Sequence, residues 1–273
     1  MKLRIRRQTL EFPRRPIVMG ILNLGADSFS GDGIVQIDRA LIRAEEMVAQ
    51  GADIIDIGAE SARTNRPAVS EQAEIDQLCA FLQAWKSPTL LSINTWRPAV
   101  ARAALAIGGD LLNDISALPT DENARICAQT GAALLIMHSI GEPKIAHTHV
   151  AYEDVMERLE TFFTDKLALA LAAGLPPEAI VLDPGIDFAK QREDNIRIYR
   201  ELHRLTKFQR PILLPVSRKT LIGDVLGLPN PADRDAGTAA CIVHGMRSGA
   251  SIFRVHNVRA AAQTVRIIEA LSA

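Results

Sequence analysis

Polar and charged residues recur along this sequence directly after short apolar runs. Asp183 follows the run Ile180–Leu182, and Pro184-Gly185 then turns the chain. Eight such runs occur, each followed by a helical pattern. The residues after the runs are Asn23, Glu60 with Arg63, Asn94, Asn113 with Asp114, Met137-His138, Asp183, Ser217-Arg218-Lys219, and Arg254 with His256.

These residue types suit an anionic group and a flat polar ring. Lys219 and Arg254, with Arg63 and Arg218 near them in the pattern, suit a phosphate or pyrophosphate. Asn23 offers an oxygen that can join phosphate oxygens around Mg²⁺. Asn113 and Asp183 offer amide and carboxylate edges that suit a heterocycle with adjacent N–H donors. No nucleophile elbow and no HExxH motif is present, so nothing favours covalent or zinc catalysis.

Each residue also has an ordinary structural explanation. Asp114 and Ser217 are typical helix caps, and Asn113 can satisfy the backbone of a turn. His138 and His256 can be core histidines. Glu60 and Arg63 can form a surface ion pair of little energetic value. Polar residues after all eight runs nevertheless favour a site where the runs end together.

The periodicity of the chain predicts eight strand–helix units. The predicted strands are Ile17–Leu22, Asp53–Gly58, Thr89–Ile93, Leu111–Ile115, Ala133–Met137, Ile180–Leu182, Ile212–Val216 and Ile252–Val255. The predicted helices are Ile37–Gln50, Ser70–Trp85, Pro98–Ile107, Glu122–Thr130, Tyr152–Ala173, Asn195–Leu205, Ala236–Arg247 and Val258–Leu271.

This order favours an α/β fold, a single (β/α)₈ TIM barrel, with its active site on the loops after the strands. We expect the barrel over residues 17–273 and a short strand or hairpin in residues 1–16. An open doubly wound sheet is the alternative, but Met19–Gly25 lacks the GxGxxG fingerprint of a dinucleotide-binding sheet.

The composition of the chain limits the classes of molecule that it is expected to bind. The 273 residues carry a net charge of -1 and 4% aromatic residues, which favours neither nucleic acid nor an anionic membrane. The three cysteines are far apart in the sequence and none belongs to a CxxC pair, which fits a protein of the reducing cytoplasm. No apolar run approaches the roughly 18 residues of a membrane span, and the basic N-terminus is not followed by a secretory h-region. We therefore expect a cytoplasmic protein with small-molecule substrates.

Several motifs, in this order and spacing, identify a resemblance. They are Met19-Gly-Ile-Leu-Asn23, Asp27-Ser-Phe-Ser30, Gly58-Ala-Glu-Ser61 with Arg63, Asn113-Asp114, Met137-His138, Asp183-Pro-Gly185, Ser217-Arg-Lys219, Gly237-Thr238 and Arg254-Val-His256. From about Ile17 to Leu271 the chain resembles the dihydropteroate synthases, a pterin-binding (β/α)₈ family. That family joins 6-hydroxymethyl-7,8-dihydropterin pyrophosphate to p-aminobenzoate in folate biosynthesis and releases pyrophosphate.

The resemblance implies roles for individual residues, with Lys219, Arg254 and Asp183 as the catalytic set. Pterin binding would fall to Asn94, Asn113, Asp183, Met137 and Lys219. Pyrophosphate binding would fall to Asn23, Arg254 and His256, with Asn23 as the ligand of Mg²⁺. The p-aminobenzoate site would comprise Phe29, Arg63 and Ser217. The resemblance also implies a homodimer paired through late helices.

Some positions depart from the pattern of the family. Asn94 replaces a usual Asp, and we expect it to lose the charge and to offer a donor in place of an acceptor. Asp187 and Ala189 replace glycines, Pro215 replaces Gly, and the first and second loops are altered. The alternatives are therefore a paralogue that binds a pterin or uses another second substrate, and a pterin-dependent methyltransferase. The retained Arg254 and His256 argue against the methyltransferase.

Overall fold

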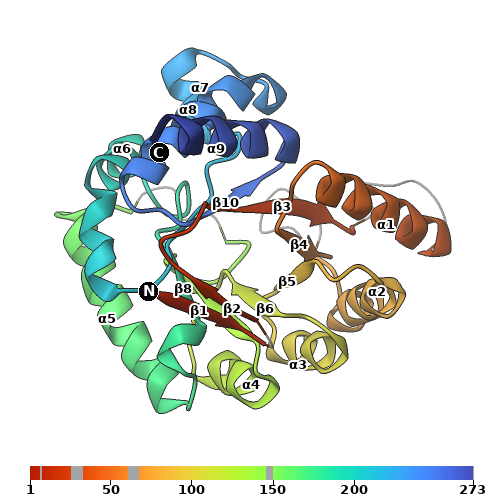
Figure 1. The fold of residues 1–273 in the computed structure, drawn as a ribbon. Coiled ribbons are helices and arrows are strands. Elements are labelled where there is room, and N and C mark those ends of the chain that lie inside the picture. The colour runs from red at the N-terminus through yellow and green to blue at the C-terminus, as the bar shows by residue number, and fades with distance from the viewer. Residues whose placement is uncertain (7, 26–32, 61–67, 146–149, 273) are drawn as a thin grey trace.

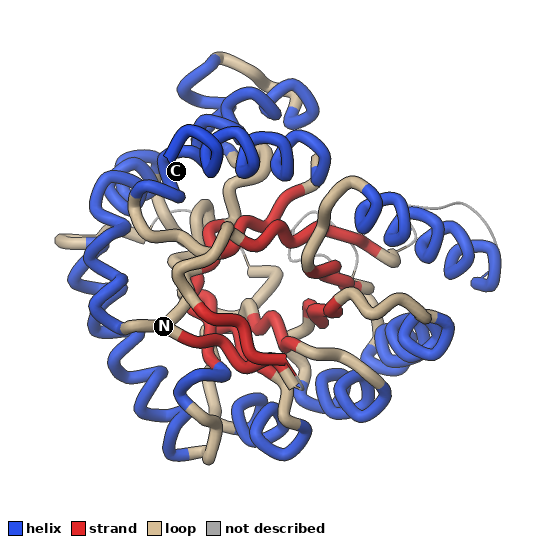
Figure 2. Tube along the Cα trace, viewed as in Figure 1, coloured by secondary structure: helices blue, strands red, loops and turns tan. Residues whose placement is uncertain are grey.

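A computed structural model describes residues 1–6, 8–25, 33–60, 68–145 and 150–272. Eight parallel strands form a ring surrounded by helices (Figures 1 and 2). The strands are β3 (Ile17–Asn23), β4 (Ile54–Gly58), β5 (Leu90–Asn94), β6 (Leu111–Asp114), β7 (Ala133–Met137), β8 (Ile180–Asp183), β9 (Leu213–Leu214) and β10 (Ile252–Val255). Their order is β8-β7-β6-β5-β4-β3-β10-β9, and a parallel bridge from Leu182 to Ile212 closes the ring. The predicted (β/α)₈ barrel is confirmed.

The helices follow the strands in the alternating order that the sequence predicts. They are α1 (Gly33–Ala49), α2 (Glu71–Ala84), α3 (Pro98–Ile107), α4 (Glu122–Thr130), α5 (Val155–Ala172), α6 (Arg192–Glu201), α7 (Thr220–Leu226), α8 (Asp235–Arg247) and α9 (Val258–Ser272). Short 3₁₀ helices η1 (Pro177–Ala179), η2 (Leu202–Phe208) and η3 (Pro231–Arg234) complete the described elements.

The largest differences from the prediction lie in the second half of the chain. Helix α7 was not predicted, and the predicted helix Asn195–Leu205 is the end of α6 followed by η2. Strand β9 is only Leu213–Leu214 instead of Ile212–Val216. It lies between Pro211 and Pro215, which have no backbone N–H to donate to a neighbouring strand.

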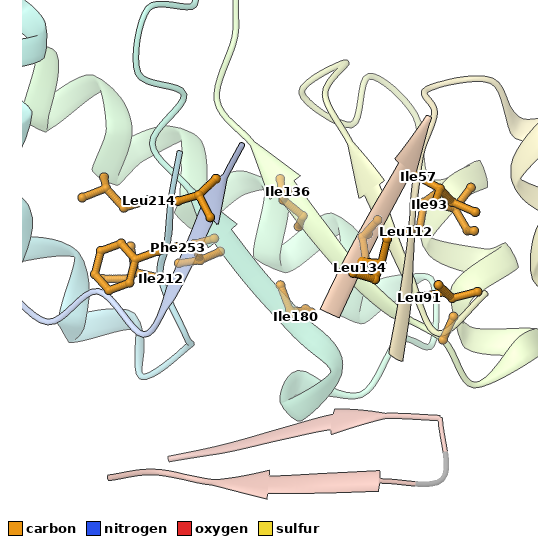
Figure 3. Close-up of a cluster of buried hydrophobic side chains, with 14 of the residues drawn as sticks. Ile57, Leu91, Ile93, Leu112, Leu134, Ile136, Ile180, Ile212, Leu214 and Phe253 are labelled. Atoms are coloured by element: carbon orange, nitrogen blue, oxygen red, sulfur yellow. The ribbon is translucent and has the colours of Figure 1, made fainter. Parts of the chain in front are cut away.

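Alternation along each strand separates two apolar layers. Residues such as Ile57, Leu91 and Phe253 face outward and pack under the helices (Figure 3). Residues such as Ile54 and Ile252 face inward and fill the barrel near its amino-terminal end. The antiparallel hairpin of β1 (Lys2–Ile5) and β2 (Gln8–Glu11) closes that end, because Leu3 and Ile5 belong to the inward-facing cluster. The functional end is therefore the opposite one, where the strands terminate.

A buried ionic cluster braces that opposite end. Arg97, at the start of α3, lies 2.7 Å from Glu60 and 2.5 Å from Glu74, and both carboxylate side chains are fully buried. The amine of Lys144 lies 3.2 Å from Glu60. Burial raises the pKa of Glu74, although hydrogen bonds from Thr95 and Arg97 oppose this. Glu60 is thus paired with Arg97 and Lys144, and its predicted partner Arg63 lies outside the described residues.

Replacing Arg97 by methionine should destabilise the fold by roughly 3–5 kcal/mol, because two buried carboxylates lose their shared cation. Equilibrium urea unfolding at pH 7.5 measures this. Arg102→Met is the matched control, since Arg102 lies on α3, which begins directly after Arg97 in the chain, but is 57% exposed in its ion pair with Glu122. It should cost about 0.5 kcal/mol or less. Equal losses in the two variants would contradict the buried role of Arg97.

Candidate active site

A polar layer lies directly above the inward-facing apolar layer of the barrel. Each of its residues follows an apolar inward residue by two positions, the period of a strand. The layer consists of Asp56 after Ile54, Ser92 after Leu90, Asn113 after Leu111, Asp183 after Val181, and Arg254 after Ile252. The barrel therefore brings polar groups from five strands to its inner face near the carboxyl-terminal end.

Asp56 is the centre of this layer. Its carboxylate is fully buried and accepts hydrogen bonds from Arg254 Nε at 2.7 Å and from Ser92 Oγ at 2.5 Å. It also accepts from Asn113 Nδ2 at 3.2 Å to both oxygens, and from Asn94 Nδ2 at 3.5 Å. Three of the predicted site residues, Asn94, Asn113 and Arg254, thus converge on a carboxylate that was not predicted.

Asp183 ends β8 as a buried carboxylate. Its Oδ1 accepts a hydrogen bond from Gly185 N at 2.7 Å. Gly185 has φ of 69°, and a Cβ there would lie 2.0 Å from the His138 carbonyl oxygen, so only glycine fits this turn. Burial raises the pKa of Asp183 to about 6, although the Gly185 N–H and the cations Lys219, Lys190 and Arg254 oppose the rise. The carboxylate is thus costly to ionise and is placed for a partner that donates hydrogen bonds.

The side-chain amine of Lys190 is buried near Asp183. Its Nζ lies 2.9 Å from His138 Nδ1 and donates to the carbonyl oxygens of Phe188 at 3.0 Å and His138 at 3.4 Å. Desolvation lowers the pKa of Lys190 to about 7, helped by the charge of Lys219 and opposed by Asp183. Burial likewise lowers the pKa of His138, so this predicted strand-end histidine is a core residue that supports the turn.

Lys190 should make folding stability depend on pH. The amine takes up a proton on unfolding between pH 7 and 10.5, so its contribution makes the protein more stable as pH rises through this window. The expected slope is about 1 kcal/mol per pH unit near pH 8 to 9. Urea unfolding at pH 7.5, 8.5 and 9.5 should show a smaller slope in Lys190→Met than in the wild type. Lys86→Met, which removes an exposed amine, should keep the wild-type slope.

The other predicted cation and histidine lie at the ends of β9 and β10. Lys219 donates to the Ile186 carbonyl oxygen at 2.7 Å, and its amine lies 5.2 Å from the centre of the Phe188 ring. Ser217 Oγ lies 2.9 Å from His256 Nδ1 and accepts from the His256 backbone N at 3.1 Å. Ser217 therefore orients His256 instead of capping the following helix.

The remaining predicted residues are placed as follows. Asn23 ends β3 and is exposed at the mouth of the barrel. Met137 is buried inside the barrel and pairs in register with Asp183. Phe29 and Arg63 lie outside the described residues, so their predicted places beside p-aminobenzoate stay predictions.

Two predicted neighbours of the site have other partners. Arg218 donates to Asp235 of α8 at 2.8 and 3.0 Å. Its backbone is left-handed, with φ of 56°. The expectation that Arg218 adds to the cations of the site is therefore wrong. Asp114 is fully buried and accepts from Ser116 and Asn123, so it organises the loop before α4.

Sequence reasoning missed Asp56 and Lys190. The sequence did contain a signal for Asp56. It is a carboxylate within the apolar strand Ile54-Ile55-Asp56-Ile57, and it lies on the same face of the strand as Ile54. A charge buried in a strand needs a partner, but the sequence does not name that partner. Lys190 gave no such signal, because only the turn from Asp183 to Lys190 encloses its amine.

Residues 19–256 match the model of a family described as pterin binding enzyme. The chain belongs to this family. A dihydropteroate synthase from Synechocystis is 39% identical over 269 residues, which cover 97% of this chain and 93% of that protein. These comparisons confirm the resemblance to the dihydropteroate synthases and the prediction of a transferase.

Solved structures agree with this assignment. Dihydropteroate synthase from Thermus thermophilus in complex with 4-aminobenzoate matches with a TM-score of 0.87 at 34% identity, covering 99% of this chain and 100% of that one. The same enzyme in complex with 6HMPPP matches with a TM-score of 0.85, also at 34% identity and with the same coverage. In the described part of the present chain, no helix is long and apolar enough to cross a membrane.

Proposed function

We propose that this protein condenses 6-hydroxymethyl-7,8-dihydropterin pyrophosphate with p-aminobenzoate in folate biosynthesis. The C–O bond to pyrophosphate breaks, pyrophosphate leaves with the electron pair, and the arylamine nitrogen forms a C–N bond and then loses a proton to solvent. The observation that carries this proposal is the buried polar layer that holds Asn113 and Asp183 together with the cations Lys219 and Arg254. A neutral arylamine is already nucleophilic, so no strong protein base is required.

The heterocycle would lie against the polar layer. Asp183 and Asn113 supply acceptors for its N–H groups, and the buried Met137, which pairs in register with Asp183, supplies an apolar contact. Asn94 and Lys219 complete the proposed pterin site from β5 and from the start of α7. These contacts hold the ring so that its methylene carbon faces the mouth of the barrel, which lowers the entropic cost of reaction.

The leaving group would bind the cationic side of the same mouth. Arg254 is fixed through its Nε by Asp56, which leaves its terminal nitrogens for phosphate oxygens. His256, oriented by Ser217, lies two residues further along the chain. Lys219 adds positive charge from the neighbouring strand end. The charges of Arg254 and Lys219 stabilise pyrophosphate as the C–O bond breaks.

Asn23 fits the Mg²⁺ that this family implies. Its exposed amide oxygen is a hard ligand beside the proposed pyrophosphate site, and the ion commonly combines few protein ligands with phosphate oxygens. The described residues contain no group of three or more His, Cys, Asp or Glu side chains that could hold a metal. Bound there, Mg²⁺ would supply further neutralisation of the leaving group.

The p-aminobenzoate site is proposed where Ser217 reaches the mouth of the barrel. Phe29 and Arg63, which follow the first and second strands in the sequence, would complete it. A guanidinium such as that of Arg63 suits the carboxylate of p-aminobenzoate.

We also propose a cytoplasmic homodimer. Helices α7 and α9 carry exposed apolar side chains, with Val225 56%, Leu226 51%, Ile267 60% and Leu271 78% exposed. The free cysteines Cys79, Cys127 and Cys241 are consistent with a reducing compartment. Light scattering in solution should give the mass of two chains, and a single-chain mass would contradict the dimer.

The proposed reaction is tested by pyrophosphate release from the pterin pyrophosphate with Mg²⁺, with and without p-aminobenzoate. We expect release that depends on p-aminobenzoate, with dihydropteroate as the product, and loss of activity in excess EDTA. Binding of the pterin pyrophosphate with no effect of any arylamine would contradict the synthase and support a pterin-binding paralogue. Retained pyrophosphate release in excess EDTA would contradict the proposed role of Mg²⁺.

A further inference from the structure

The side-chain amide of Asn113 is oriented by its contact with Asp56. Asn113 Nδ2 lies 3.2 Å from both oxygens of the Asp56 carboxylate. A carboxylate paired with a guanidinium only accepts hydrogen bonds, so the amide nitrogen, the donor, must face it. Asn113 Oδ1 therefore points away from Asp56. Asn113 is 2% exposed, and no residue that the structure describes donates a hydrogen bond to this oxygen.

Asn94 is oriented by the same carboxylate. Its Nδ2 lies 3.5 Å from Asp56 Oδ2, and its side chain packs against Gly58, where an added Cβ would lie 3.2 Å from Asn94 Cβ. The close approach to Gly58 limits how far the side chain can turn. Among the described residues none donates to Asn94 Oδ1 either, and the half-buried side chain reaches solvent at the mouth.

Asp56 itself is held from both sides of its own strand, β4. Ser92, on the neighbouring strand β5, donates to Oδ1, and Arg254, on β10, donates to Oδ2. In the register of the sheet Asp56 pairs with Ile21 of β3, and Arg254 pairs with Met19 of the same strand, so the ion pair crosses the inner face of β3. The carboxylate therefore cannot rotate without breaking contacts to two strands.

We infer, on the basis of the proposed function, that Asp56 is a positioning residue that turns the carbonyl oxygens of both Asn94 and Asn113 toward the heterocyclic substrate. Asn94 is then a specificity-determining hydrogen-bond acceptor. The expectation that Asn94 offers a donor where the family usually has an Asp is replaced by this inference, because Asp56 occupies the donor side of the amide.

The resulting ligand edge has three acceptors. Asn94 Oδ1, Asn113 Oδ1 and the carboxylate of Asp183 come from β5, β6 and β8, and only the first two acceptors are uncharged. A ring with several adjacent N–H donors, such as a dihydropterin, matches this edge. A ring that presents an acceptor at the position of Asn94 would leave two acceptors opposed and bind more weakly.

Substitutions of Asn94 test its hydrogen-bond role directly. The probe is 6-hydroxymethyl-7,8-dihydropterin without pyrophosphate, so that contacts of Arg254 with phosphate do not enter the measured Kd. In calorimetric titrations at pH 8, Asn94→Asp should bind within about threefold of wild type, because one acceptor replaces another. Asn94→Leu, of similar size, should bind about tenfold or more weakly. An unchanged Kd for Asn94→Leu overturns the inference.

Asp56→Asn tests the positioning role. The new amide can donate as well as accept, so it frees Asn94 and Asn113 to rotate, and we expect binding of the same probe to weaken about tenfold or more. The control is Asp53→Asn, which removes a carboxylate paired with Arg15 near the opposite end of the barrel and should leave the Kd unchanged. A folded Asp56→Asn with the wild-type Kd overturns the inference, and the Asn94 pair decides it if Asp56→Asn does not fold.

The wild type provides a separate check of the proposed function. Failure of the wild type to turn over the pterin pyrophosphate with p-aminobenzoate counts against the synthase. The ratios of probe affinity between variants and wild type then still decide whether Asp56 orients the two amides.

Discussion

Arg254→Met should lower kcat/KM by about 10³-fold. The guanidinium is the proposed clamp on the leaving pyrophosphate, and removing a preorganised charge of this kind typically costs about 10²- to 10³-fold in rate. Its Nε bond to Asp56 fixes its direction before substrate arrives, so the interaction needs little rearrangement in the transition state. Steady-state assays of pyrophosphate release measure the loss.

The same substitution should destabilise the fold by roughly 3–5 kcal/mol, because Asp56 is left buried without its cation. The double variant Asp56→Asn with Arg254→Met removes that unpaired charge. We expect it to recover much of the stability in urea unfolding and none of the activity. Recovery of activity together with stability would show that Arg254 acts only through the fold.

Asp183→Asn should lower affinity for the pterin pyrophosphate by about 100-fold and yet raise thermal stability at pH 8. The carboxylate accepts hydrogen bonds that a neutral amide matches poorly, and charge-assisted bonds are about twice as strong as neutral ones. The fold also bears the desolvation cost of this carboxylate above its pKa of about 6. Because the pKa of Asp183 is raised in the folded state, protonated Asp183 stabilises the fold at low pH, and this stabilisation is lost as pH rises through about 6. The neutral amide of Asp183→Asn does not ionise, so the variant avoids that loss.

The affinity of the wild type for the pterin pyrophosphate should depend on pH through the ionisation of Asp183. Protonation of Asp183 below about pH 6 removes an acceptor, so affinity for the pterin pyrophosphate should fall as pH falls from 7 to 5. Calorimetric titrations across this range, with Asp183→Asn as the comparison, measure the effect. A variant that keeps the wild-type decline would assign the pH dependence to another group, and a variant with lower melting temperature at pH 8 would contradict the desolvation argument.

Sequence alone determined the architecture and most of the proposed site. Eight apolar runs, each followed by a helical pattern, have few compact solutions, and parallel strands in a barrel place their carboxyl ends together. For this reason Asn23, Asn94, Asn113, Asp183, Lys219, Arg254 and His256 could be named as candidates before any geometry was considered.

Tertiary structure decided which of these groups act on one another. Asp56 meets Arg254 across 198 positions of sequence, and it meets Asn113 across 57, because barrel closure and register bring their strands together. Local backbone decided two other cases. A left-handed turn accompanies the pairing of Arg218 with Asp235, and the turn at Gly185 encloses the amine of Lys190. Periodicity specifies which face of a strand a residue occupies, but the partner across the barrel depends on long-range packing that no local pattern encodes.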